Sequence, residues 1–238
     1  MSYFGWLFDP ANWTGSGGIP TRLVEHLGYV ALAMIIALVI ALPLGAWVGH
    51  TGRGGFLVVG SANALRALPT LGVLILLVTP FGLSIVGPLI ALVVLAIPPL
   101  LAGTYAGVRN VDPAVVDAAR GMGMRGPEVL WRVELPNALP LIIGGVRSAV
   151  LQVVSTATIA AYVGLGGLGR FIFDGLAQRD FPQMIGGSLL VALLAIIVDL
   201  LLAALQKFIV SPGLQVVPSG PRRLRTVPTA RPAAARAA

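Results

Sequence analysis

Cysteine is absent from this sequence of 238 residues, and histidine occurs only twice, at His26 and His50. Without thiols the chain can form neither disulfides nor thiolate metal sites, and two histidines are too few for a metal cluster. The phosphate-binding loop G-x-x-x-x-G-K-S/T is also missing, so we expect that the chain does not itself hold ATP. We therefore predict that the protein is not an enzyme and binds no cofactor or metal of its own.

Charged residues are scarce, at 11% of the chain, whereas a soluble domain contains about 25%. Hydrophobic residues make up 57%, and the mean hydropathy is +0.92. This composition is typical of a membrane protein. The first residues, MSYFGWLFDPANW, have no basic region ahead of an apolar run and no small-residue cleavage site. We therefore expect no cleavable signal peptide, and the first span would direct its own insertion.

Five segments are long and apolar enough to cross a bilayer, which requires about 20 residues in a helix. The predicted spans cover residues 23–48, 56–78, 84–105, 138–161 and 185–208. In the second span Asn63, Arg66 and Pro69 interrupt the apolar run, so residues 56–68 could instead lie at the membrane interface. The expected fold is an all-α membrane helix bundle of about five transmembrane helices, with six as the alternative count.

Basic residues fall mainly on one side of these spans. If the N-terminus is outside, the outer loops contain only Arg22, Arg170 and Arg179, while Arg66 and Arg147 lie within spans. The other eleven of the 16 Lys and Arg residues are then cytoplasmic. Because cytoplasmic loops carry the excess of basic residues, we expect the N-terminus outside and the C-terminus in the cytoplasm. The net charge of +7 therefore requires no nucleic-acid partner.

This topology divides the chain into three parts. Residues 1–22 are predicted to form an external N-terminal segment, and residues 23–211 the transmembrane domain. Residues 212–238 are rich in Pro, Arg and Ala without apolar periodicity, so we expect a disordered cytoplasmic tail. Its basic residues could contact anionic membrane lipid.

A polar stretch at residues 116–136, with the sequence VDAARGMGMRGPEVLWRVELP, interrupts this apolar chain. Just before it, Asp112 and Pro113 suit the start of a helix, as N-cap and first helical residue. Gly121 and Gly123 are expected to weaken or end this helix after about three turns. The stretch therefore begins with a short helix on the cytoplasmic side of the predicted spans.

A second short helix is expected after Gly126 and is predicted to stop at Pro136, because proline disrupts a helix interior. Trp131 lies in this second helix and is interpreted as a docking or interfacial anchor. Two interpretations of the whole loop remain open from its residues alone. It is either an amphipathic segment that lies at the membrane interface or a docking element for another protein.

The spacing within this loop resembles the signature of the permease subunits of binding-protein-dependent ABC importers. That signature reads E-A-A, three residues, G, nine residues, then I-x-L-P. The matching residues here are Asp117, Ala118, Ala119, Gly123, Val133, Leu135 and Pro136, with Asp in place of Glu and Val in place of Ile. The resemblance implies that these residues, together with Gly121, belong to a cytoplasmic coupling helix that sits in a cleft of an ATPase subunit.

The similarity covers about residues 23–212 and extends to one branch of the family. The runs RALPT, ELPNALPLIIGGVRSAVLQVVSTATIAAYVGLGGLGRFIFDGLAQRD and IIVDLLLAALQKF resemble the permeases for glycine betaine, carnitine, choline and related osmoprotectants such as proline betaine. Permeases for methionine share this layout, so an importer for methionine or another amino acid is the alternative. A secondary transporter is a further alternative, although no repeated half is visible in the sequence.

The resemblance also implies partners and a location. Such a permease forms half of a translocation pathway, paired with a second copy or a paralogue in the cell membrane of a prokaryote. A separate ATPase dimer would bind ATP and Mg²⁺, and an extracytoplasmic solute-binding protein would deliver the solute. Membrane lipid would surround the permease.

Polar side chains inside spans are candidate functional residues because they are costly in hydrocarbon. Gln152, Ser155 and Thr156 lie within about one turn and are predicted to line the translocation pathway, or else to bond neighbouring helices. Arg147 and Asp199 each lie about nine or ten residues from the cytoplasmic side, so we expect them at similar depth. We predict that they pair, because an unpaired charge there is costly; alternatively, Asp199 is protonated or faces a wet cavity.

The loop before the last span has two further features. Asp174, Arg179 and Asp180 could contact a binding protein, or could simply be solvated. The glycine-rich run YVGLGGLGR follows a predicted span and not a buried strand, so it is interpreted as a tight external turn. The four tryptophans do not cluster in any span, so an aromatic cage for quaternary ammonium groups is expected in the separate binding protein.

Overall fold

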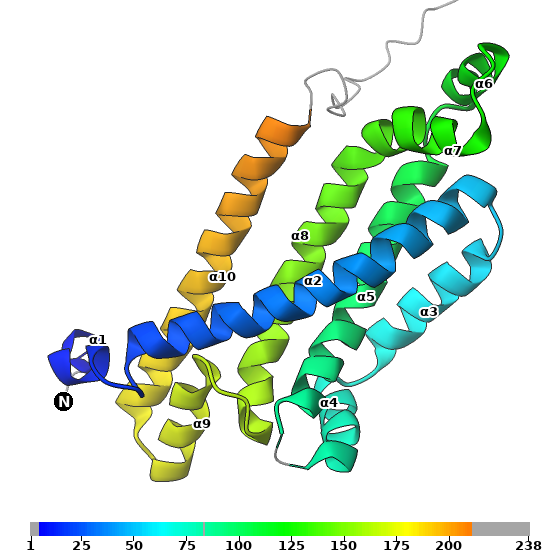
Figure 1. The fold of residues 1–238 in the computed structure, drawn as a ribbon. Coiled ribbons are helices and arrows are strands. Elements are labelled where there is room, and N and C mark those ends of the chain that lie inside the picture. The colour runs from blue at the N-terminus through cyan, green and yellow to red at the C-terminus, as the bar shows by residue number, and fades with distance from the viewer. Residues whose placement is uncertain (1–4, 83, 211–238) are drawn as a thin grey trace, which may run out of the picture.

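The computed structural model describes residues 5–82 and 84–210, and every regular element within those ranges is helical. The long helices are α2 (Ile19–Thr51), α5 (Val86–Arg109), α8 (Leu135–Ala160) and α10 (Phe181–Ile209). The shorter ones are α1 (Gly5–Phe8), α3 (Gly55–Ala67), α4 (Thr70–Val78), α6 (Pro113–Gly121), α7 (Gly126–Val129) and α9 (Gly169–Gln178). Figure 1 shows an elongated bundle with α6 and α7 at one end, called here the α6 end, and α9 at the other, the α9 end. The predicted tail at 212–238 lies outside the described residues.

Four continuous helical stretches are long and apolar enough to cross a membrane, namely Ile19–Thr51, Val86–Arg109, Gly126–Val163 and Phe181–Ile209. A fifth candidate is bent, because Gly55–Leu65 and Thr70–Phe81 meet at 95°. Pro69 explains this bend: Leu68 before it has an extended backbone (φ −75°, ψ 137°), which the residue before a proline favours. The predicted all-α membrane bundle is thus confirmed, with a second span that is broken and not straight.

Helix α5 packs against both α2 and α8, and α2 crosses over the two in Figure 1; glycines allow both neighbours to approach α5 closely. A Cβ atom added to Gly103 of α5 would lie 2.7 Å from Gly145 Cα of α8. A Cβ atom added to Gly45 of α2 would lie 2.8 Å from Thr104 Cβ of α5. Small residues at helix contacts are the usual way in which membrane helices gain van der Waals packing, since hydrocarbon gives little hydrophobic drive between them. Glycine therefore fixes the positions of α2 and α8 around α5.

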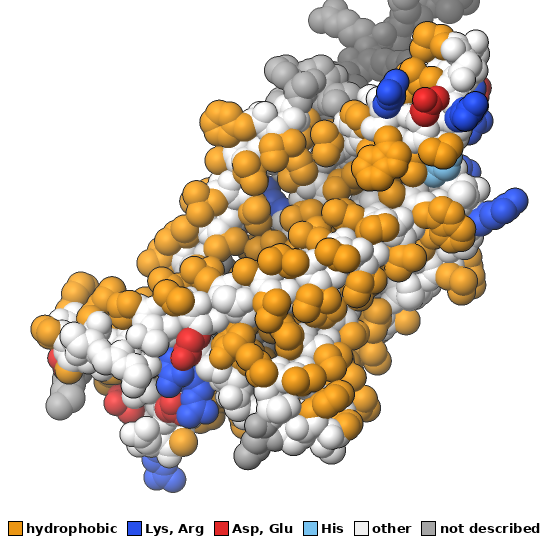
Figure 2. All heavy atoms as spheres, viewed as in Figure 1, with side chains coloured by type: hydrophobic (Ala, Val, Ile, Leu, Met, Phe, Trp, Pro, Cys, Tyr) orange, Lys and Arg blue, Asp and Glu red, His pale blue; other side chains and the backbone are white. Residues whose placement is uncertain are grey.

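Helix α10 packs against α9 and α8 near the α9 end, and its other half stands apart from α2 and α5 (Figure 1). Its large apolar side chains are exposed in the single chain, with Leu200 at 63% and Phe208 at 88%. On the face drawn in Figure 2, hydrophobic side chains cover the middle of the molecule and most charged ones gather towards the two ends. This distribution suits a surface that contacts lipid or another membrane subunit.

We expect Gly145→Ala to weaken the packing of α8 on α5. The added Cβ atom would lie 2.9 Å from the Pro99 carbonyl oxygen and 3.0 Å from Gly103 Cα, so the two backbones must separate. Overpacking of this kind costs about 1–3 kcal/mol, which should lower the melting temperature of the purified protein in detergent. Gly144→Ala is the matched control, because a Cβ atom there meets nothing within 4 Å. Equal melting temperatures for the two variants would contradict this account of the contact.

Candidate functional site

Helix α6 begins as the sequence predicts. The carboxylate of Asp112 accepts a hydrogen bond from the Ala114 backbone N–H (2.9 Å), and Pro113 is the first helical residue. The helix is at the tip of the α6 end, where Asp117, Ala118 and Gly121 are exposed to solvent. Most of its surface therefore has no contact within the chain.

Gly123 ends this segment with a left-handed backbone. Its φ is +88°, a conformation that costs a residue with a Cβ atom about 1–2 kcal/mol. The Met124 N–H donates to the Ala119 carbonyl (3.2 Å), and the Gly123 N–H donates to the Arg120 carbonyl (2.9 Å). These bonds form a typical glycine-containing helix C-cap, in which otherwise unpaired carbonyls gain donors. The glycine of the predicted motif thus sets the angle at which the chain leaves α6.

The second helix of the loop does not stop at Pro136, as the sequence predicted, but runs without a break into α8. Helix α7 continues through a π turn at Leu130–Glu134, so that Gly126–Val163 is one helical stretch. A π turn shifts the hydrogen bonds by one residue, and such turns absorb local departures from the α-helical pattern. Pro136 is the second residue of α8 and lacks an N–H, so it follows directly on the turn where the hydrogen bonding is already irregular. The motif residues Val133, Leu135 and Pro136 therefore belong to the base of a spanning helix.

A side-chain hydrogen bond connects this π turn with α2. His50 Nδ1 donates to the Glu134 carboxylate at 2.6 Å, and Glu134 is only 5% exposed. His50 also lies beside α7, since a Cβ atom added to Gly126 would be 3.5 Å from its Nε2. Sequence analysis missed this bond because the partners are 84 residues apart and neither belongs to the motif. The last turn of α2 is thus fixed to the segment that joins α6 to the membrane bundle.

Along α8, Ser148, Gln152 and Ser155 are exposed and occupy one helix face. Thr156 does not share this surface as predicted: it is 1% exposed, and its hydroxyl donates to the Gln152 carbonyl (2.8 Å). Hydroxyl groups in membrane helices are commonly satisfied in this way by their own backbone. Its oxygen also accepts a bond from Gln152 Nε2 (3.4 Å), so Thr156 orients Gln152.

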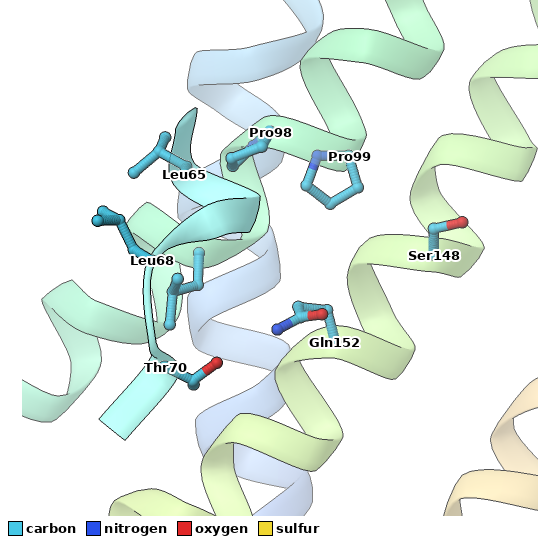
Figure 3. A pocket seen from close by; sticks show the side chains of 8 residues that line it. Leu65, Leu68, Thr70, Pro98, Pro99, Ser148 and Gln152 are labelled. Carbon is cyan, nitrogen blue, oxygen red and sulfur yellow. The ribbon is translucent and has the colours of Figure 1, made fainter. Parts of the chain in front are cut away.

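A cavity of about 280 Å³ lies beside this face, between α5, α8 and the break that separates α3 from α4. Figure 3 shows Gln152 projecting from α8 towards Thr70, with Ser148 one turn away. The lining residues are Leu65, Leu68, Thr70, Leu95, Pro98, Pro99, Ser148 and Gln152. The cavity thus combines two neutral hydroxyl groups and an amide with apolar walls, and Ser155 lies outside it.

Arg147 and Asp199 meet in a two-pronged ion pair between α8 and α10. Arg147 Nε donates to Asp199 Oδ1 (2.5 Å), and the second donor reaches Oδ2 at 2.6 Å. Planar guanidinium and carboxylate groups match in this geometry, which gives direction as well as attraction. Arg147 also borders a separate cavity of about 730 Å³ among α5, α8 and α10. The equal depth that the sequence indicated therefore brings the two charges into contact.

The α9 end contains a helix that sequence analysis described only as a polar loop. Within or beside α9, Asp174 pairs with Arg170 (2.9 Å), while Asp180 caps α10 by accepting from the Gln183 N–H (3.1 Å). The glycine-rich run before α9 forms a turn, in which the Gly167 N–H donates to the Glu25 carboxylate of α2 (2.9 Å). These acidic side chains stabilise the local fold, and Arg179 takes the left-handed C-cap position of α9. The amphipathic pattern of RFIFDGLAQ was the missed signal.

Comparison with known proteins gives a consistent result. Residues 37–211 match the family described as "Binding-protein-dependent transport system inner membrane component". The chain is 33% identical over 202 residues to a glycine betaine/carnitine/choline transport system permease protein of Bacillus subtilis, covering 85% of this chain and 93% of that protein. It is 32% identical over 205 residues to an osmoprotectant import permease protein of Salmonella typhimurium, covering 84% and 95%.

Solved structures share the fold at lower identity. A chain of the methionine ABC transporter in an inward-facing conformation gives a TM-score of 0.70 at 20% identity, covering 85% of this chain and 99% of that one. An amino acid ABC transporter determined with histidines gives a TM-score of 0.62 at 21% identity, covering 80% and 91%.

We expect Gly123→Ala to weaken the C-cap of α6 without disturbing the membrane bundle. A Cβ atom at this position meets nothing within 4 Å, so the cost of about 1–2 kcal/mol arises from the left-handed backbone alone. The α6 C-cap should loosen, and amide hydrogen exchange at residues 119–124 should accelerate. Gly121→Ala is the control, because that residue is helical, equally open in space, and alanine favours a helix. Slower or equal exchange in Gly123→Ala would refute the assignment of the cap.

We expect His50→Ala to destabilise the junction of α7 and α8 more than the double variant His50→Ala/Glu134→Gln. The single change leaves a buried carboxylate without its partner, whereas the double change also removes the charge. Melting temperature and hydrogen exchange at residues 126–134 would measure the effect in both variants. Thr51→Ala is the control, since its hydroxyl makes only local bonds, donating to the Trp47 carbonyl and accepting from the Arg53 N–H. Strictly additive effects of the His50 and Glu134 changes would show that the two side chains do not interact.

Proposed function

This chain belongs to the binding-protein-dependent transport system inner membrane components, and we propose that it forms half of the translocation pathway of an ATP-driven importer for quaternary-amine osmoprotectants. As a member of that family it is a permease subunit of an ABC importer. The finer parts of the proposal concern its solute, its partners and its orientation. The partners and the orientation rest on the helix at the α6 end, whereas the solute class rests on the named relatives and is compatible with the polar cavity beside α8.

The single observation that carries the coupling role is an exposed helix at the α6 end that is connected through α7 to the spanning helices. Helix α6 leaves the apolar side chains of Val115 and Met122 44% and 74% exposed at its tip. Apolar side chains gathered among charges on a projecting segment suit a protein partner. The α7–α8 continuity and the His50–Glu134 bond then connect this surface to two spanning helices. An ATPase subunit is the partner that the motif implies.

Orientation and the other partners follow from this assignment. If α6 contacts an ATPase, the α6 end is cytoplasmic and the N-terminus lies outside, as the basic residues also favour. The α9 end then faces a solute-binding protein. ATP and Mg²⁺ would be bound by the ATPase dimer, and the exposed apolar face of α10 would contact lipid, a second permease copy or a paralogue.

The solute class is inferred from the relatives and is compatible with the cavity. The named relatives transport glycine betaine, carnitine, choline or osmoprotectants, and they match over 84–85% of this chain. The cavity lined by Thr70, Ser148 and Gln152 contains neutral polar groups, which would admit a zwitterion or a cation. The amino-acid alternative is favoured less, because the transporters with amino-acid names were found by fold at only 20–21% identity.

Uptake of radiolabelled glycine betaine into membrane vesicles tests the proposal directly. Vesicles would contain this chain, its candidate ATPase and its binding protein, with ATP supplied on the ATPase side. We expect ATP-dependent accumulation that excess choline or carnitine reduces and excess methionine does not. An ATPase variant unable to hydrolyse ATP is the control for leak.

Two outcomes would contradict the proposal. If glycine betaine does not accumulate and methionine is the solute that competes for the importer, the chain would be assigned to the amino-acid importers. The coupling role would remain intact. Accumulation that does not depend on ATP would remove the coupling role itself.

A further inference from the structure

The cavity beside α8 lacks the groups that usually attract a quaternary ammonium ion. None of its eight lining residues is acidic, and none is aromatic. Carboxylates attract such cations by charge, and aromatic rings do so through their π faces. Any attraction for a methylated ammonium must therefore come from neutral oxygen atoms, and the backbone is one source of them.

Two adjacent prolines in α5 release backbone carbonyls at this cavity. Pro98 and Pro99 both lie inside the helix, and neither has an N–H. In an α-helix the N–H of residue i bonds the carbonyl of residue i−4. The carbonyls of Val94 and Leu95 therefore have no donor from the normal helical pattern. An unsatisfied carbonyl in the membrane interior is costly, so it is retained where it faces a wet or functional cavity.

The two released carbonyls differ in their position relative to the cavity. Leu95, Pro98 and Pro99 all line it, whereas Val94 does not. Because the carbonyl of a helical residue lies beneath the nitrogen four residues later, the Leu95 oxygen is on the face that carries Pro99 and the Val94 oxygen on the face that carries Pro98. Of the two residues, only Leu95 itself lines the cavity. Figure 3 shows the Pro99 ring on the side of α5 that faces Ser148 and Gln152 of α8.

We propose that the Leu95 backbone carbonyl, together with the side-chain oxygens of Thr70, Ser148 and Gln152, forms a transient binding site for a methylated ammonium group. This site deepens the proposed function and rests on it, because it assigns a place in the pathway where the solute's cationic end is recognised. The cavity has no acidic or aromatic side chain that could attract the cation. Selectivity would therefore depend on the carbonyl oxygen that proline in α5 leaves without a donor.

The chemistry suits this class of solute better than a primary amine. The positive charge of a trimethylammonium group is spread over its methyl groups, which make C–H···O contacts with carbonyl oxygens but cannot donate an N–H bond. Such contacts are individually weak. A transport pathway needs sites that a solute enters readily and leaves quickly, so weak contacts with several neutral oxygens are appropriate.

Cysteine labelling measures this preference without depending on a particular solute. The chain has no cysteine, so Ser148→Cys introduces a single, nearly isosteric thiol into the cavity. The variant, assembled with its ATPase in vesicles, would be labelled with a trimethylammonium-ethyl methanethiosulfonate and with a neutral methyl methanethiosulfonate. The ratio of the two rate constants reports the local preference for a methylated ammonium.

Restoring the missing N–H should reduce that ratio. In Pro99→Ala the new N–H can bond the Leu95 carbonyl, and we expect the cationic-to-neutral ratio to fall about three- to tenfold. Pro98→Ala supplies an N–H only for the Val94 carbonyl, so it should change the ratio less. Pro43→Ala is the control, since Pro43 lies inside α2 and does not line this cavity. The neutral reagent's own rate shows whether each variant keeps the cavity accessible.

An unchanged ratio in Pro99→Ala, with the neutral rate preserved, would overturn the carbonyl site. A thiol at position 148 that neither reagent reaches would also overturn it, because the cavity would then be closed to solute. Both results are distinguishable from failure of the proposed function. That failure would appear as absence of quaternary-amine uptake by the unaltered chain, whatever the labelling ratio.

Discussion

The close approach of α5 and α8 at Gly103 and Gly145 is the contact on which the rest of the structure depends. Without side chains at these two positions, the backbones touch, and the Pro99 carbonyl lies against Gly145. One turn further along α8 lie Ser148 and then Gln152, so the same contact sets the width of the polar cavity. At the base of α8 the helix continues into the π turn and α7. Packing at one point therefore positions both the candidate pathway and the candidate coupling surface.

Hydrocarbon imposes a second constraint, because a buried polar group there has no water to bond. The bundle meets this constraint in several ways. Thr104 donates its hydroxyl to the Leu100 carbonyl (2.8 Å), as Thr156 does within α8. The fully buried His26 has its Nε2 3.2 Å from the Val154 carbonyl of α8, whereas its Nδ1 has no partner among the described residues. Arg147 and Asp199 neutralise each other. The Leu95 carbonyl, which Pro99 deprives of its helical donor, is a departure from this pattern, which is why its position at a cavity matters.

Hydropathy and residue spacing predicted much of this architecture, because both depend on short-range properties. Apolar length located the spans, and the rise per residue placed Arg147 and Asp199 at one depth. Sequence could not predict that Thr156 turns into the bundle, since that depends on how α8 packs. It also failed at Pro136, where the usual rule that proline ends a helix was overridden by a π turn. The His50–Glu134 bond joins distant residues and leaves no periodic signal.

The continuity of α7 with α8 determines what motion of the coupling segment can do. From Val129 to Gln152 the helix extends about 35 Å at 1.5 Å per residue, so a small tilt at its base becomes a larger displacement at the cavity. The π turn is the point where such a helix would bend most easily, because its hydrogen bonds are the least regular. Glu134 lies within that turn and is held by His50 of α2. In the proposed importer, a force on α6 would therefore be shared between α2 and α8, and the His50–Glu134 bond would limit bending at the π turn.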